Sequence, residues 1–95
     1  MTNSQTRLLA KAYGRVQDVH FRDFLVYHAH QLGVSGYVRN LPSGTAVELV
    51  AEGERAKLEC LLEQMHRGPP AAWVGRVERK WLPSQHEFLG FSIRW

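Results

Sequence analysis

The segment from Gly14 to Arg22, Gly-Arg-Val-Gln-Asp-Val-His-Phe-Arg, has the residue types of an anion-binding loop. It connects a short, partly alternating apolar stretch to a helical pattern, so that backbone N–H groups and an arginine meet at a helix N-terminus. Unpaired N–H groups and the helix dipole favour negative charge there, and a guanidinium can bind two phosphoryl oxygens at once. These features predict a phosphate site. Spacing alone favours the simpler interpretation, in which Arg22 is a surface residue of a first helical turn.

Asn40 is a second candidate for chemistry, because it lies at the end of a predicted strand, just before the turn that contains Pro42 and Gly44. Asparagine is depleted in strands, and near a strand end it more often serves as a local turn former. A carboxamide close to a phosphate site can also orient a water molecule. The neighbours of Asn40 in the fold have to decide between these two interpretations.

Hydrophobic periodicity predicts the elements that position both candidates. The sequence indicates a strand over 7–13, a helix from Phe21 to Leu32 closed by Gly33, and a hairpin with strands over 36–41 and 46–51. A second helix is expected from about Glu54 to Gly68, followed by alternating strands over 73–81 and 88–95.

This order of elements predicts an α+β protein with a ferredoxin-like split β-α-β sandwich, in which two helices pack on one face of an antiparallel sheet. The strand that ends at Asn40 is expected to lie beside the first strand, close to the loop that precedes Arg22. A flexible segment is expected over 1–6, followed by one domain over 7–95. Because this fold carries many unrelated functions, the function has to come from particular residues.

Composition narrows the function further. The chain has 95 residues, a net charge of +3, five scattered histidines and one cysteine, Cys60, so that neither an internal disulfide nor a metal framework is expected. The first residues are polar, and no apolar run is long enough to span a bilayer. We therefore expect a soluble, cytoplasmic, monomeric protein that needs no metal or other cofactor and has no membrane or nucleic-acid partner.

Two separated motifs resemble the signatures of the acylphosphatase family. The first is matched by Gly14, Val16, Gln17, Val19, Phe21 and Arg22. The second is matched by Gly36, Tyr37, Val38, Asn40 and Gly44, followed by Val47 and Gly53. The ending, Gly90 to Trp95, is similar to the closing strand of the family. Two motifs in the same order are far more specific than either motif alone.

The resemblance implies an enzyme that hydrolyses the carboxyl–phosphate anhydride bond of small acyl phosphates to carboxylate and inorganic phosphate. It implies that Arg22 binds the phosphoryl group, that Asn40 orients the attacking water, and that no covalent intermediate forms. The implied phosphate-binding loop consists of Arg15, Val16, Gln17, Asp18, Val19, His20 and Phe21. The phosphate of the substrate is then the expected acceptor of the proton from the water.

Asp18 departs from the family pattern, which has glycine at this position. Glycine permits a positive φ and a close approach of phosphate, whereas a carboxylate beside bound phosphate opposes anion binding. Asp18 therefore supports a second hypothesis, a catalytically weak module of the same fold that binds phosphate or acyl phosphate.

The remaining candidates have plainer interpretations. An RNA-binding domain on the same fold is the third hypothesis, but Trp73, Trp81 and Trp95 are expected mostly to pack on the core. Cys60 is expected to be a buried or half-buried structural thiol, and His20 a solvent-exposed side chain. Arg39 alternates with Asn40 and should face solvent on the opposite side of the sheet.

Overall fold

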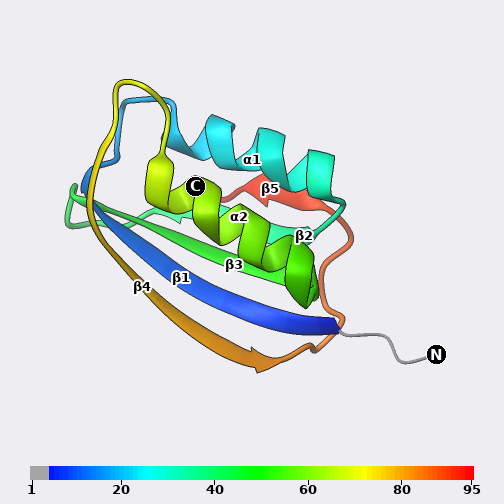
Figure 1. Cartoon of the computed structure of the whole chain (residues 1–95). Helices are drawn as coiled ribbons and strands as arrows, with labels where there is room; N and C mark the ends of the chain where they lie inside the picture. Colours follow the sequence, from blue (N-terminus) through cyan, green and yellow to red (C-terminus); the bar gives the residue numbers. More distant parts are fainter. Residues whose placement is uncertain (1–4) are drawn as a thin grey trace.

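Five strands form one mixed sheet, and two helices cover one of its faces in the computed structural model, which describes residues 5–95 (Figure 1). The elements are, in chain order, β1 (Gln5–Arg15), α1 (Phe21–Leu32), β2 (Ser35–Asn40), β3 (Ala46–Glu54), α2 (Arg55–Arg67), β4 (Trp73–Pro83) and β5 (Phe91–Ile93). The strands lie in the order β4-β1-β3-β2-β5. The predicted ferredoxin-like α+β class is confirmed, and most predicted boundaries agree within a few residues.

The expected flexible segment over 1–6 falls mainly outside the described residues. Gln5 and Thr6 already belong to β1, where they pair with Glu54 and Gly53 of β3. Neither helix within the described part of the chain is long and apolar enough to cross a membrane.

The pairing of β5 differs from the expected antiparallel sheet. The pairs β1–β3, β1–β4 and β2–β3 are antiparallel, whereas β5 runs parallel to β2. The reason is the path of the chain after β4. The connection over 84–90 starts at the end of the sheet where β1 begins, and it crosses to the β2 edge at that same end (Figure 1). β5 must therefore set out in the same direction as β2.

The expectation that the strand ending at Asn40 lies beside the first strand was wrong, because β3 separates β2 from β1. A split β-α-β unit leaves room for one strand between its two parallel strands, and the antiparallel β3 fills that space. Asn40 consequently pairs with Val47 of β3.

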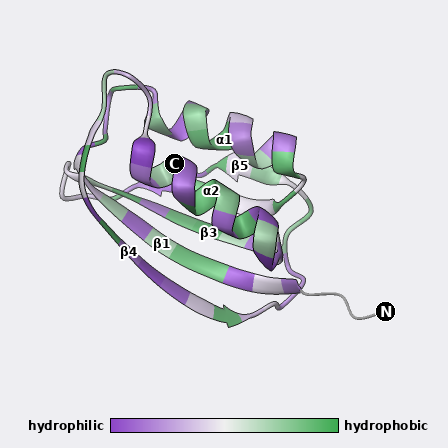
Figure 2. Cartoon of the chain, in the orientation of Figure 1, coloured by the Kyte–Doolittle hydropathy of each residue, from purple (hydrophilic) through white to green (hydrophobic). Residues whose placement is uncertain are grey.

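The core lies between the sheet and the two helices. α1 buries Phe21, Leu25 and Ala29 at helical spacing, and Gly33 ends it in the left-handed conformation, as predicted. The buried residues of α2 are Leu58, Leu61, Leu62 and Met65. Hydrophobic residues interrupt the hydrophilic surface of both helices in Figure 2. Alternate residues of β1 and β3 complete the core from the sheet: Leu8, Ala10, Ala12, Val47, Leu49 and Ala51.

A β-bulge changes the predicted alternation of β4. The register between β1 and β4 shifts after Tyr13, so that Val74 and Val77 both pack against the core despite their odd spacing. The strict alternation predicted over 73–81 would put them on opposite sides, so it fails at this point. The bulge brings the backbone of Trp73 close to Gly14, whose φ is 139° and where any Cβ would clash with the Trp73 carbonyl. A motif glycine is thus required where β1 meets the start of β4.

Glu52 holds the connection over 84–90 against the sheet. It is only 3% exposed, accepts hydrogen bonds from the backbone N–H groups of Gln85 (2.7 Å) and Glu87 (3.4 Å), and binds the Arg7 guanidinium at 2.8 Å. Arg7 also pairs with the Glu87 carboxylate. Burial raises the pKa of Glu52, but the bonds from the Gln85 amide and from Arg7 outweigh this effect and leave the pKa below its ordinary value.

We expect Glu52→Gln to lower the free energy of unfolding by about 2 kcal/mol at pH 7, because the connection loses a charged acceptor. A carboxyl group whose pKa is lowered by folding stabilises the protein above its ordinary pKa of 4.5 and loses that contribution as the pH falls. The difference between wild type and variant should therefore narrow between about pH 5 and pH 3 in urea unfolding. Glu63→Gln, on the exposed side of α2, is the control. A difference that stays constant with pH would contradict this assignment.

Candidate active site

Three of the segments that the sequence motifs marked converge at one end of the sheet. β1, β2 and β5 run in the same direction and all end there, and α1 begins there. The loop that follows β1, the end of β2 and the residues that follow β5 are therefore brought to one place (Figure 1).

The loop between β1 and α1 is anchored by apolar side chains. Val16, Val19 and Phe21 are buried, whereas Asp18 and His20 are exposed and have φ values of 60° and 62°. Asp18 thus adopts the left-handed conformation that glycine would adopt at lower cost. His20 is solvent-exposed, as expected, and its ring lies 3.7 Å from the Asp23 carboxylate.

The start of α1 offers free backbone donors at the pocket. Phe24 donates the first bond of the helix, to the His20 carbonyl at 3.0 Å. The N–H groups of Phe21, Arg22 and Asp23 precede it, so they have no partner inside the helix and stand at the positive end of its dipole.

Arg22 lies in a pocket of about 390 Å³ at this helix end. The residues that line the pocket are Val16, Asp18, His20, Phe21, Arg22, Asp23, Ile93 and Trp95. The Arg22 Cζ atom stands 4.4 Å from the centre of the Trp95 ring. A guanidinium that is stacked by its face keeps its N–H groups free, because they lie in its plane.

Asn40 occupies the same end of the sheet but does not line this pocket. It shares the helix-covered face of β2 with Val38, which is fully buried, and its carboxamide oxygen is buried without a hydrogen-bond partner among the described residues. A buried acceptor of this kind costs about 1–3 kcal/mol unless a donor reaches it. Gly36 allows β2 to approach β3 closely, since a Cβ there would clash with the Val50 carbonyl.

Gln17 joins the loop to the strand that carries Asn40. Its side-chain amide donates to the carbonyls of Leu41 (2.9 Å) and Ala46 (2.8 Å), which flank the turn between β2 and β3. The sequence placed Gln17 in the loop but gave no sign of this contact, because its partners lie far along the chain.

Several sequence interpretations need correction here. Trp73 and Trp95 are 67% and 91% exposed, and only Trp81 packs on the core. Cys60 is exposed because it lies on the face of α2 opposite the apolar stripe, so the buried thiol was a wrong expectation. Arg39 faces the opposite side of the sheet from Asn40, as predicted, and its Nε atom lies 2.7 Å from the Glu48 carboxylate.

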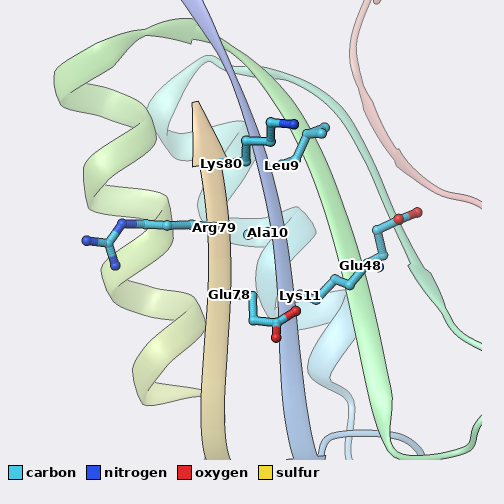
Figure 3. Close-up of a pocket in the computed structure, with 7 residues that line it drawn as sticks. All are labelled: Leu9, Ala10, Lys11, Glu48, Glu78, Arg79 and Lys80. Atoms are coloured by element: carbon cyan, nitrogen blue, oxygen red, sulfur yellow. The ribbon is translucent and has the colours of Figure 1, made fainter. Parts of the chain in front are cut away.

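A second hollow lies on the open face of the sheet (Figure 3). Lys11 pairs there with Glu48 on one side and Glu78 on the other, so acidic and basic side chains alternate across the strands. The hollow has no helix N-terminus and no left-handed loop. Within residues 5–95, no group of histidine, cysteine, aspartate and glutamate is arranged to hold a metal ion.

The fold and the pocket define a ferredoxin-like α+β protein with a pocket at the N-terminus of its first helix, beside the loop that follows its first strand. A family model described as acylphosphatase matches residues 9–93. An acylphosphatase of Thermococcus kodakarensis is 51% identical over 81% of this chain and 84% of its own length. An acylphosphatase of Caldivirga maquilingensis is 44% identical over 96% of this chain and 94% of its own.

The solved structures agree with these relatives. The crystal structure of acylphosphatase from Bacillus subtilis matches with a TM-score of 0.90 at 30% identity, over 95% of this chain and 99% of that one. The chain belongs to the acylphosphatase family, whose members are hydrolases that act on acid anhydrides.

We expect Gln17→Glu to lower the free energy of unfolding by about 1–3 kcal/mol, because a carboxylate would face two carbonyl oxygens in place of an amide donor. Urea unfolding measures the loss, and amide hydrogen exchange over 15–21 should become faster. Gln31→Glu, the same change at an exposed position of α1, should cost less than about 1 kcal/mol. Equal losses in the two variants would show that the contacts of Gln17 with Leu41 and Ala46 do not hold the loop.

Proposed function

We propose that this chain hydrolyses the carboxyl–phosphate anhydride of small acyl phosphates, with Arg22 binding the phosphoryl group and Asn40 orienting the attacking water. The observation that carries the proposal is the position of Arg22, whose guanidinium shares one pocket with the loop before α1 and the free amides of that helix. Phosphoryl transfer depends on placement and charge stabilisation more than on a nucleophilic side chain.

The loop from Arg15 to Phe21 supplies the cradle for the phosphoryl oxygens. The side chains of Val16, Val19 and Phe21 are buried, and the left-handed residues Asp18 and His20 alternate with them. In this proposal, the backbone N–H groups of the loop then face the bound anion. Arg22 adds a full positive charge to these partial charges. Its stacking on Trp95 restricts the plane of the guanidinium, so fewer degrees of freedom are lost when phosphate binds.

Asn40 is suited to hold water because its buried carboxamide oxygen can accept a hydrogen bond from a water O–H group. The water oxygen then keeps a lone pair for attack at phosphorus. Arg39, Leu41 and the cross-strand partner Val47 surround Asn40 along the sheet, and none of these is a general base. The proton therefore passes to the phosphate of the substrate in this proposal.

The proposal extends to the compartment, the assembly and the partners of the protein. A single exposed thiol, Cys60, suits a reducing compartment, and we place this domain in the cytoplasm. The edge strand β4 presents charged, exposed side chains, Arg76, Glu78 and Arg79, which oppose pairing with a second copy. We propose a monomer that acts on a small molecule without a cofactor and binds neither nucleic acid nor membrane.

Arg22→Ala should weaken inorganic phosphate binding and lower kcat/KM for an acyl phosphate by about a thousandfold, because the charged donor is lost. Asn40→Ala should lower kcat by about a hundredfold while phosphate binding changes little. Hydrolysis assays together with phosphate inhibition measure both effects. Arg39→Ala, on the opposite face of the sheet, is the control and should keep wild-type rates. A wild-type rate that follows the titration of a histidine would contradict the proton transfer to the substrate.

One observation favours the second candidate, a weak phosphate-binding module. The Asp18 side chain lines the same pocket as Arg22 and brings negative charge close to the anion. This charge weakens binding and does not remove any of the groups that the reaction needs.

We expect Asp18→Gly to strengthen phosphate binding and raise kcat/KM by about fivefold, the effect of removing a like charge near the surface. Asp18→Asn removes the carboxylate charge but keeps a residue with a Cβ at the positive φ. It therefore measures the effect of the charge without the change in backbone strain. Phosphate inhibition and initial rates of both variants measure the effect. An unchanged or lower kcat/KM in Asp18→Gly would reject the idea, and a wild type that binds phosphate without turnover would favour the binding module.

A further inference from the structure

Trp95 is held at the pocket although the core does not bury it. It is 91% exposed, yet its ring lies 4.4 Å from the Arg22 Cζ atom and forms part of the pocket wall. The backbone before it is fixed, because the Arg94 N–H donates to the Val38 carbonyl at 2.9 Å. A large apolar ring that is exposed at a pocket commonly marks a ligand contact.

The walls of this pocket differ in polarity. The side formed by the β1–α1 loop and the start of α1 contributes the polar groups Asp18, His20 and Asp23 besides Arg22, and its apolar residues Val16 and Phe21 are buried. The side formed by β5 and the residues after it contributes only apolar groups, Ile93 and Trp95. An acyl phosphate bound by Arg22 and the loop must extend its acyl group past one of these sides. An apolar acyl group would lose hydration without compensation against the polar side, but it gains contact against the side formed by Ile93 and Trp95.

We propose that Trp95 determines the acyl specificity of the reaction. Its indole ring receives the acyl group, together with Ile93, and favours aromatic acyl groups over acetyl. One face of the ring lies on Arg22, and because the residue is so exposed, the rest of its surface is open to substrate. This inference rests on the proposed hydrolysis of acyl phosphates and adds the substrate class that the site selects.

The test compares benzoyl phosphate with acetyl phosphate in wild type, Trp95→Ala and Trp95→Phe. The ratio of kcat/KM for benzoyl phosphate to that for acetyl phosphate should fall about threefold to tenfold in Trp95→Ala, the range expected for loss of an aromatic pair. Trp95→Phe keeps a ring and should keep the ratio within about twofold. Trp73→Ala removes another exposed tryptophan, from β4 and outside the pocket, and should leave the ratio unchanged.

Inhibition by inorganic phosphate distinguishes acyl binding from the positioning of Arg22. If Trp95→Ala lowers both rates equally and weakens phosphate inhibition, the ring only positions Arg22 and the inference is overturned. An unchanged ratio in Trp95→Ala, with an active wild type, overturns the inference and leaves the proposed function intact. A wild type that hydrolyses neither substrate overturns the proposed function, and this inference with it.

Discussion

The parallel pairing of β5 with β2 is the constraint on which the site depends. Backbone bonds from Gly36 to the Gly90 carbonyl (2.8 Å) and from Arg94 to the Val38 carbonyl (2.9 Å) hold the two strands in register. Because β2 and β5 run the same way, Asn40 and Trp95 come to the same end of the sheet, where α1 begins with Arg22. An antiparallel β5 would carry Trp95 to the opposite end and leave the guanidinium without its stacking partner.

This pairing needs a fixed approach, which the opposite end of the sheet provides. The connection over 84–90 must leave the β4 edge, cross the sheet and reach β2 in register. Glu52 binds the backbone of this connection, and Arg7 neutralises its charge. Ring contacts add to this anchor, because Phe88 packs edge-on against the Tyr37 ring and the Arg94 Cζ atom lies 3.8 Å from the centre of the same ring. A polar cluster distant from the pocket thus contributes to the position of Trp95.

The loop at the pocket and the end of β2 depart from the most stable local structure. Asp18 and His20 hold left-handed conformations, and the Asn40 carboxamide oxygen is buried without a hydrogen-bond partner within residues 5–95. Each feature costs free energy that the well-packed core and the contacts of Gln17 have to offset. Strain and unpaired polar groups of this kind are expected where a protein keeps donors and acceptors available for a ligand.

The local pattern of the sequence determined the elements and the main motifs. Helical spacing of Phe21, Leu25 and Ala29 with Gly33 after them specified α1, and the segment before Arg22 specified the loop that leads into this helix, because these signals act between near neighbours in the chain. The tertiary structure decided the direction of β5, the position of β3 between β1 and β2, and the contacts of Gln17, Glu52 and Trp95. Each of these features joins residues that are far apart in the sequence, often through backbone groups that every residue carries. The type of a residue therefore does not indicate its partner.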